Sequence, residues 1–136
     1  MYLAAPINRI VKPKISISEG RAEVEIEVRG DLFHSAGAVH GSVYFKMLDD
    51  AAFFAANSLE QSVFVLTTSF TIYLTRPVSA GTIRAVGTVT TETKTQFLAE
   101  SIAYDARGKE IGRGSGLFVR GRQRLDDVVS YALGDP

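Results

Sequence analysis

The hydrophobic residues of the chain follow two different periods, and most of the chain follows the shorter one. From Arg21 to Arg29, four apolar residues alternate with Glu and Arg side chains. Such alternation is typical of a strand with one buried face and one wet face. The turn residues Ser18-Glu19-Gly20 come just before it. We therefore expect residues 14–18 and 21–29 to form a hairpin.

Further strands are predicted in the second half of the chain. The runs are rich in β-branched and aromatic residues, and Gly, Pro and Asp residues separate them. In the last of these runs, three alternate glycines lie on one face, where a backbone or a ligand could approach closely: Gly112, Gly114 and Gly116. The predicted strands cover residues 63–75, 82–94, 96–104 and 109–120.

One segment, residues 40–58, combines helical length with strong helix formers and is apolar on nearly every side. A helix of this kind is buried. Together with the strands it predicts an α+β fold, in which an antiparallel sheet of five to six strands wraps around one long central helix. We expect a short helix or arm over residues 1–13 and a short surface helix over residues 123–133.

Composition narrows the functions that this fold can carry. The 136 residues fit a single domain, 1–136, and the 15 basic and 15 acidic residues leave no net charge for binding nucleic acid or a membrane surface. The absence of cysteine excludes disulfides, thiolate metal sites and a cysteine nucleophile. The first residues lack the pattern of a signal peptide, and no window is apolar enough to span a membrane. We therefore expect a cytoplasmic protein.

Two adjacent acids, Asp49 and Asp50, interrupt the apolar helix. Asp50 follows Lys46 by four residues and is expected to form an ion pair with it. Asp49 points about 60° away from Lys46, toward Phe45 and two small residues. A carboxylate at the edge of an apolar pocket has a raised pKa and suits a general base or a nucleophile. Capping, or pairing with a distant group, is the alternative interpretation.

The start of this helix is a second candidate site. Gly41 and Ser42 lie in its first turn, where backbone N–H groups lack intrahelical partners and the helix dipole is positive. A glycine there lets a ligand carbonyl approach the amide, as in an oxyanion hole. A flexible start of the helix, without a binding role, is the other interpretation.

The segment His40-Gly41-Ser42, followed by six residues and then Asp49, resembles the hotdog-fold thioesterases, specifically the PaaI-like branch of the 4-hydroxybenzoyl-CoA thioesterase superfamily. The family pattern is His-Gly-Gly, six residues, then Asp, so Ser42 replaces the second glycine. The resemblance implies a hotdog fold and hydrolysis of an acyl-CoA thioester, with coenzyme A as part of the substrate and no other cofactor. It implies that Asp49 acts as general base or nucleophile and that the Gly41 amide polarises the thioester carbonyl.

Other positions are assigned through the same resemblance. Thr67 falls where relatives place a serine or threonine that orients water or the carboxylate, and His34 stands where the branch usually has an asparagine near the thioester. The histidine could donate a hydrogen bond or carry a proton. The predicted substrate contacts are His40, Ser42, Phe45, Arg76 and Arg120, the two arginines being candidates for CoA phosphates. For His40, fixing the loop is the alternative, and for each arginine a solvated basic edge.

The spacing of Gly41 and Asp49 predicts a shared site. The two residues are eight positions apart, which is about 12 Å along a helix, whereas both must lie within about 3 Å of the reacting centre. One chain therefore cannot supply both groups to one substrate. The resemblance likewise implies two hotdogs side by side, with a dimer of dimers as the larger assembly.

Three alternatives concern the chemistry of the site. A non-catalytic acyl-CoA binder or sensor is the main alternative, because His34 departs from the family pattern. A hotdog dehydratase is disfavoured because residues 38–42 contain no proline at the helix start. A metal site built from His34, His40 and Asp49 is disfavoured because Asp49 lies far along the helix from His40.

Overall fold

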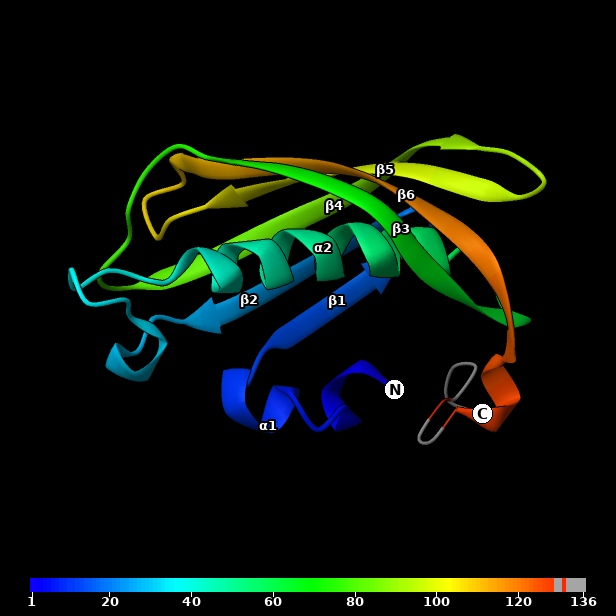
Figure 1. Cartoon of the computed structure of the whole chain (residues 1–136), viewed down its shortest axis with the longest axis horizontal. Coiled ribbons are helices and arrows are strands. Elements are labelled where there is room, and N and C mark those ends of the chain that lie inside the picture. Colours follow the sequence, from blue (N-terminus) through cyan, green and yellow to red (C-terminus); the bar gives the residue numbers. More distant parts are fainter. Residues whose placement is uncertain (129–130, 132–136) are drawn as a thin grey trace.

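The computed structural model describes residues 1–128 and 131, and its main feature is one six-stranded antiparallel sheet curved around the helix α2 (Gly41–Asn57) (Figure 1). The sheet order is β1-β2-β4-β5-β6-β3. The strands are β1 (Lys14–Ser18), β2 (Arg21–Glu27), β3 (Val63–Leu74), β4 (Thr82–Glu92), β5 (Gln96–Tyr104) and β6 (Glu110–Arg124). The predicted α+β plan, with a sheet around one helix, is confirmed.

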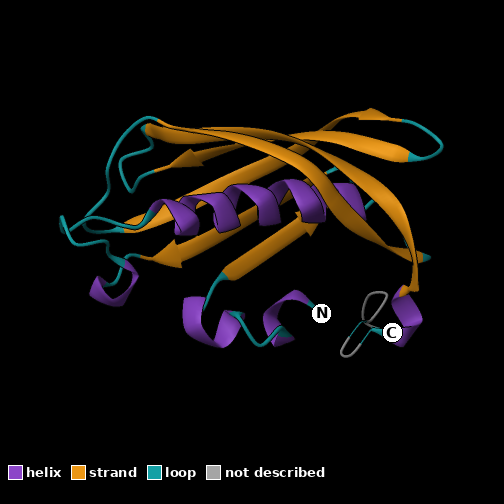
Figure 2. Cartoon of the chain, viewed as in Figure 1, coloured by secondary structure: helices purple, strands orange, loops and turns teal. Residues whose placement is uncertain are grey.

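Helix α2 lies in the hollow of the sheet, with β2 and β4 behind it and β3 crossing in front of its C-terminal end (Figure 2). Small residues permit a close approach: Ala51, Ala52 and Ala55 are fully buried. At Gly87 of β4, a Cβ atom would lie 2.1 Å from the Ala51 carbonyl oxygen. Any side chain at position 87 would therefore push the helix off the sheet, so this glycine fixes the depth at which the helix packs.

The Phe70 ring covers the face of β6 that carries Gly114 and Gly116. Antiparallel pairing of β3 with β6 sets Phe70 opposite Gly116. Cβ atoms at Gly114 and Gly116 would lie 2.6 and 2.3 Å from the Phe70 ring. The close approach that the alternating glycines predict is therefore confirmed, and an aromatic side chain makes it.

The N-terminal segment and the last described turn, η3, lie on the same side of the molecule (Figure 1). The N-terminal segment forms the 3-10 helix η1 (Tyr2–Ala4) and the short helix α1 (Asn8–Val11). At the other end, the prediction of a helix over 123–133 is wrong where the structure describes it. Strand β6 continues to Arg124 because it pairs with Val63, and one 3-10 turn, η3 (Leu125–Asp127), follows. Residues 129–130 and 132–133 of that prediction lie outside the described part.

Strand β3 forms one edge of the sheet and carries exposed apolar side chains, Leu66, Tyr73 and Leu74. None of the described helices is long and apolar enough to cross a membrane.

Candidate active site

The centre of the candidate site is Asp49, in the middle of α2, with Thr67 of β3 beside it. The Thr67 hydroxyl donates a hydrogen bond of 3.0 Å to Asp49 Oδ1. Burial of the carboxyl raises its pKa to about 6; the Thr67 hydrogen bond opposes this shift, Asp50 adds to it and Lys46 opposes it. Asp49 therefore exchanges its proton close to neutral pH, as a general base must.

Asp49 and Thr67 line a cavity of about 760 Å³. The walls come from the N-terminal segment, from α2 and from the first half of β3. Most of the lining is apolar, including Tyr2, Ala5, Ile7, Phe53, Phe64 and Leu66. This volume lies in the range of pockets that bind small organic molecules. The carboxylate expected at the edge of an apolar pocket is thus found there.

Asp50 has a different surrounding. Its Oδ2 accepts hydrogen bonds from Lys46 Nζ and, at 2.7 Å, from the Tyr2 hydroxyl. Both Lys46 and Asp50 side chains are less than one-fifth exposed. The predicted i, i+4 ion pair is confirmed, and Tyr2 is a further partner that the sequence did not indicate.

The helix start is organised by His40 and Ser42. His40 is the N-cap of α2, and its Nδ1 accepts a 3.0 Å hydrogen bond from the Ser42 amide. The Ser42 hydroxyl lies 2.8 Å from the same nitrogen. Gly41 is the first residue of the helix, so its N–H has no intrahelical acceptor. His40 thus fixes the helix start, which was the structural alternative for this residue, and leaves the Gly41 amide available.

His34 lies in the loop before α2, with its side chain exposed. Its Nδ1 accepts a 3.1 Å hydrogen bond from the Ala36 amide. The candidate residues therefore fall into two groups. His34, His40, Gly41 and Ser42 belong to the loop and first turn of α2. Asp49 lies about 12 Å further along the same helix, with Thr67 of β3 beside it.

Phe45 lies on α2 between these two groups, and Arg76 lies just beyond the end of β3. The Phe45 side chain is 40% exposed and contacts Phe70 edge-to-face at 5.5 Å. Arg76 follows β3, and its carbonyl accepts a hydrogen bond from the Tyr44 hydroxyl. Its side chain lines a separate, smaller cavity of about 370 Å³ together with Arg107 and Lys109. These three cations make that cavity positively charged, apart from Asp105 in its lining.

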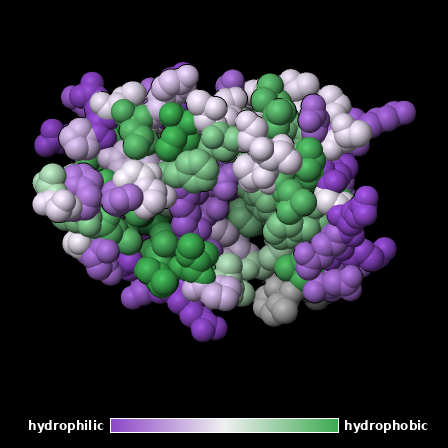
Figure 3. Space-filling model, in the orientation of Figure 1, coloured by the Kyte–Doolittle hydropathy of each residue, from purple (hydrophilic) through white to green (hydrophobic). Residues whose placement is uncertain are grey.

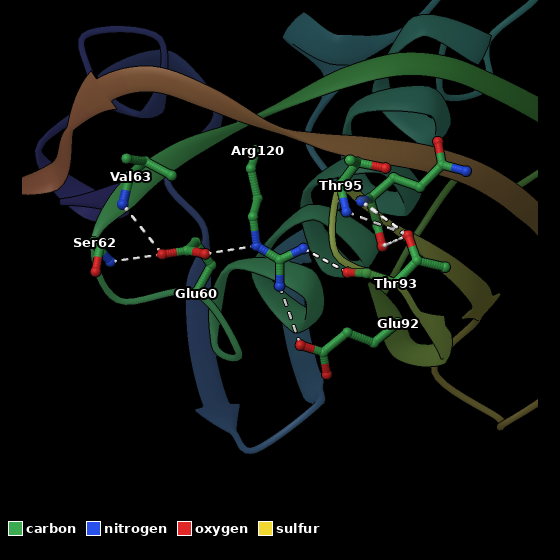
Figure 4. Close-up of polar contacts among 8 residues, drawn as sticks. Glu60, Ser62, Val63, Glu92, Thr93, Thr95 and Arg120 are labelled. Atoms are coloured by element: carbon green, nitrogen blue, oxygen red, sulfur yellow. Dashed lines mark hydrogen bonds and ion pairs between the residues drawn. The ribbon is translucent and has the colours of Figure 1, made fainter.

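The Arg120 side chain binds other residues of the same chain (Figure 4). Its guanidinium donates to Glu60 at 2.8 Å, to Glu92 at 3.1 Å and to the Thr93 carbonyl at 2.7 Å. It also lies 4.3 Å over the Phe97 ring. Binding a CoA phosphate would require Arg120 to leave these partners, so the structure argues against the predicted substrate contact. The sequence could not indicate this because both glutamates are distant along the chain.

The part of the chain that the structure describes brings no three His, Asp or Glu side chains together in a way that could hold a metal ion.

Tyr2 is the residue that the sequence reasoning missed. The first 13 residues have no periodic pattern, and only the folded chain places this ring against Phe54, at 4.9 Å, and its hydroxyl on Asp50.

Known proteins share the family pattern and the fold of this chain. A sequence model of the thioesterase superfamily matches residues 36–111, and no curated protein sequence matches the chain. Among solved structures, the chain superposes on the Escherichia coli PaaI protein from the phenylacetic acid degradation operon with a TM-score of 0.84. The identity is 22%, and the match covers 91% of this chain and 90% of PaaI.

Two other structures are almost as similar. A conserved protein from Pseudomonas aeruginosa gives a TM-score of 0.82 at 22% identity, covering 88% of this chain and 96% of that protein. An esterase candidate from Mycobacterium tuberculosis gives 0.81 at 20% identity, covering 88% and 99%. The resemblance to PaaI-like proteins and the predicted hotdog fold are confirmed. With more than half of its length matched by the family, the chain belongs to the thioesterase superfamily.

Proposed function

We propose that this protein is an acyl-CoA thioesterase that hydrolyses its substrate to the free acid and coenzyme A. The observation that carries the proposal is Asp49. Its carboxyl group lies at an apolar cavity, accepts a hydrogen bond from Thr67 and has a pKa raised to about 6. A carboxylate with these properties can take a proton from water near neutral pH, or attack a thioester carbonyl directly.

In the general-base form of the mechanism, Asp49 takes a proton from water while the water oxygen bonds to the thioester carbon. Electrons move to the carbonyl oxygen, and the Gly41 N–H at a helix N-terminus stabilises that oxyanion. Collapse of the intermediate expels the CoA thiolate, which receives the proton. In the nucleophilic form, Asp49 attacks the carbon itself and expels the CoA thiolate, and water then hydrolyses the resulting anhydride to the free acid and the Asp49 carboxylate.

The site is proposed to form between two copies of the chain, with Asp49 from one and Gly41 from the other. The separation of the two residues on one continuous helix supports this arrangement. Strand β3 supports it as well, because Thr67 lies on this edge strand, whose exposed apolar side chains include Tyr73 and Leu74. Such an edge is a template for pairing with another strand. A dimer of dimers is the expected larger assembly.

Other substrate contacts are proposed at the helix start and beyond the end of β3. His34 lies in the loop that leads to the Gly41 amide, and the exposed Phe45 ring lies one helical turn further on. Arg76, with Arg107 and Lys109 beside it, offers positive charge for the phosphates of CoA. The structure favours Arg76 over Arg120 for this role because Arg120 already binds two glutamates.

The test is thiol release from short, medium-chain and aromatic acyl-CoAs by the wild type and by matched variants. Asp49→Asn should abolish turnover. Gly41→Pro removes the amide proton at the first helical position, where proline is tolerated, and the extended backbone of His40 suits a following proline. Gly41→Ala keeps the amide and is the matched control. A Cβ there meets the flexible end of Leu74 at 3.1 Å.

The same variants test the shared site. Asp49→Asn and Gly41→Pro chains, unfolded together and refolded in equal amounts, should recover about a quarter of wild-type activity, because half of the dimers then contain one intact site of two. Inactive mixtures with confirmed heterodimers would contradict a site shared between subunits. Tight binding of acyl-CoA by the wild type without any thiol release would instead favour the alternative of a binding protein, which His34 in place of the usual asparagine keeps open.

A further inference from the structure

We propose that the N-terminal arm, residues 1–9, forms one wall of the acyl pocket and thereby selects a bulky apolar acyl group. The inference rests on the proposed function for the identity of the thioester, but its structural basis is independent of catalysis. The cavity beside Asp49 is bounded on one side by the arm and on the other by α2 and β3. Whatever is joined to a carbonyl at Asp49 has this cavity beside it.

Most of the lining fits a hydrophobic group; its charged members are Arg9, Asp49 and the paired Lys46 and Asp50. Ala5 and Ile7 of the arm line it together with Phe53 and Phe64 of the opposite walls. Phe53 and Phe64 lie 5.4 Å apart between ring centroids and form an aromatic surface. Burial of an apolar chain against such a surface tightens binding about fourfold per methylene. An acetyl group offers too little surface to use it.

The arm is a built wall because three contacts anchor it. The Tyr2 side chain is buried between its hydrogen bond to Asp50 and its edge-to-face contact with Phe54. Lys46 completes the cluster, with its Nζ 5.2 Å from the centroid of the Tyr2 ring. Asn8, which is 5% exposed, donates a 2.7 Å hydrogen bond to the Tyr2 carbonyl and so closes the arm on itself.

The outer side of the arm is hydrophobic as well. Hydrophobic side chains gather over α1 in the space-filling view (Figure 3). Leu3, which does not line the cavity, is 59% exposed. Two positions close together in the arm therefore differ in their relation to the cavity: Ala5 borders it and Leu3 does not. This difference supplies a matched pair of substitutions.

The experiment measures kcat/KM for acetyl-, hexanoyl-, decanoyl- and benzoyl-CoA. In the wild type it should rise at least about 10-fold from acetyl to the bulkiest acyl group accepted. Ala5→Phe fills the cavity and should remove most of that preference while the acetyl value changes less than about threefold. Leu3→Phe adds the same ring outside the cavity and should keep the wild-type profile. Tyr2→Phe should raise KM for the bulky substrates several-fold with little change in kcat.

Binding of inert S-alkyl-CoA thioethers, measured by calorimetry, separates this inference from the proposed function. If the wild type releases no thiol but binds S-decyl-CoA much more tightly than S-ethyl-CoA, and Ala5→Phe removes the difference, the arm proposal stands and the thioesterase proposal fails. If the wild type hydrolyses all chain lengths equally, or Ala5→Phe changes every substrate by one factor, the arm proposal is overturned and the thioesterase stands. Ile7→Ala, which enlarges the cavity, should shift the preference toward longer chains and replaces Ala5→Phe if that variant fails to fold.

Discussion

Asp49 and Asp50 are neighbours in the chain, but they lie on two different sides of α2. Asp50 faces the N-terminal arm, where Lys46 and the Tyr2 hydroxyl bind its carboxylate. Asp49 faces β3, where Thr67 is the one side chain that hydrogen-bonds it among the described residues. A cation and a phenol stabilise the charge of Asp50, whereas burial raises the pKa of Asp49 to about 6.

The comparison teaches that the partners of an acid, more than its burial, decide what it can do. Both carboxylates border the same cavity and both are half-buried. An acid that already accepts hydrogen bonds from a cation and a phenol holds the surrounding structure together. An acid with one neutral donor retains lone pairs for a proton or a carbonyl.

The first test exchanges charge for an amide at each position. Asp49→Asn should lower kcat/KM by at least about 100-fold, because the amide cannot take a proton. Asp50→Asn should lower it by less than about 10-fold, since that carboxylate is already occupied by Lys46 and Tyr2. Equal losses in steady-state thiol release from the two variants would remove the distinction between the acids.

The second test measures the free energy of urea-induced unfolding at pH 7 for two variants of the cluster formed by Tyr2, Lys46 and Asp50. Asp50→Asn should destabilise the fold by about 1–2 kcal/mol, because Lys46 and Tyr2 lose a charged acceptor in a partly buried setting. Lys46→Met, in the same cluster, is a second way to break the ion pair and should also destabilise. A stability unchanged in both variants would show that this cluster does not hold the arm.

The third test removes the single donor to Asp49. Thr67→Val keeps the shape and deletes the hydroxyl, so kcat/KM should fall about fivefold. The rate needs the carboxylate form and should rise with pH through about 6 in the wild type. The Thr67 hydrogen bond lowers this pKa, so the acid limb of the pH–rate profile should move to higher pH in the variant. A shift to lower pH would contradict the assigned hydrogen bond.

The fourth test concerns stability and pH. The folded-state pKa of Asp49, about 6, exceeds the ordinary value of 3.8, so the folded protein holds this proton more tightly than the unfolded chain. The associated stability is present below pH 4 and is lost as pH rises through 6. Asp49→Asn should therefore raise the free energy of unfolding above pH 7 by up to about 1 kcal/mol, after allowance for solvent screening. No gain in the free energy of unfolding is expected at pH 4. A gain at pH 4 with none above pH 7 would contradict a raised pKa of Asp49 in the folded protein.

Much of the architecture could be predicted from periodicity. The helix over 40–58 and the strands over 14–18, 63–75 and 96–104 were placed within one residue of the observed ends. The C-terminal prediction failed because Arg124 pairs with Val63 of β3, and strand pairing depends on a partner about 60 residues away. Local propensity carries no information about such a partner.

The candidate site divides in the same way. Asp49, Asp50 and Lys46 could be related by helical spacing alone, because α2 fixes their directions within one element. The Tyr2 contact and the use of Arg120 by Glu60 and Glu92 could not be foreseen, because 48, 60 and 28 positions separate the partners. The Asp49–Thr67 pair was expected only through resemblance to a family.

Helical periodicity is enough to predict that a buried helix carries two acids in different directions and that Lys46 pairs with Asp50, because a helix repeats its geometry from residue to residue. The Tyr2 hydroxyl at Asp50, the Thr67 hydroxyl at Asp49 and the cavity that both acids border depend on the folded chain. That outcome depends on how β3 and the N-terminal arm pack on either side of α2. Packing sums many distant contacts, and its result at one carboxylate is visible only when the whole chain is folded.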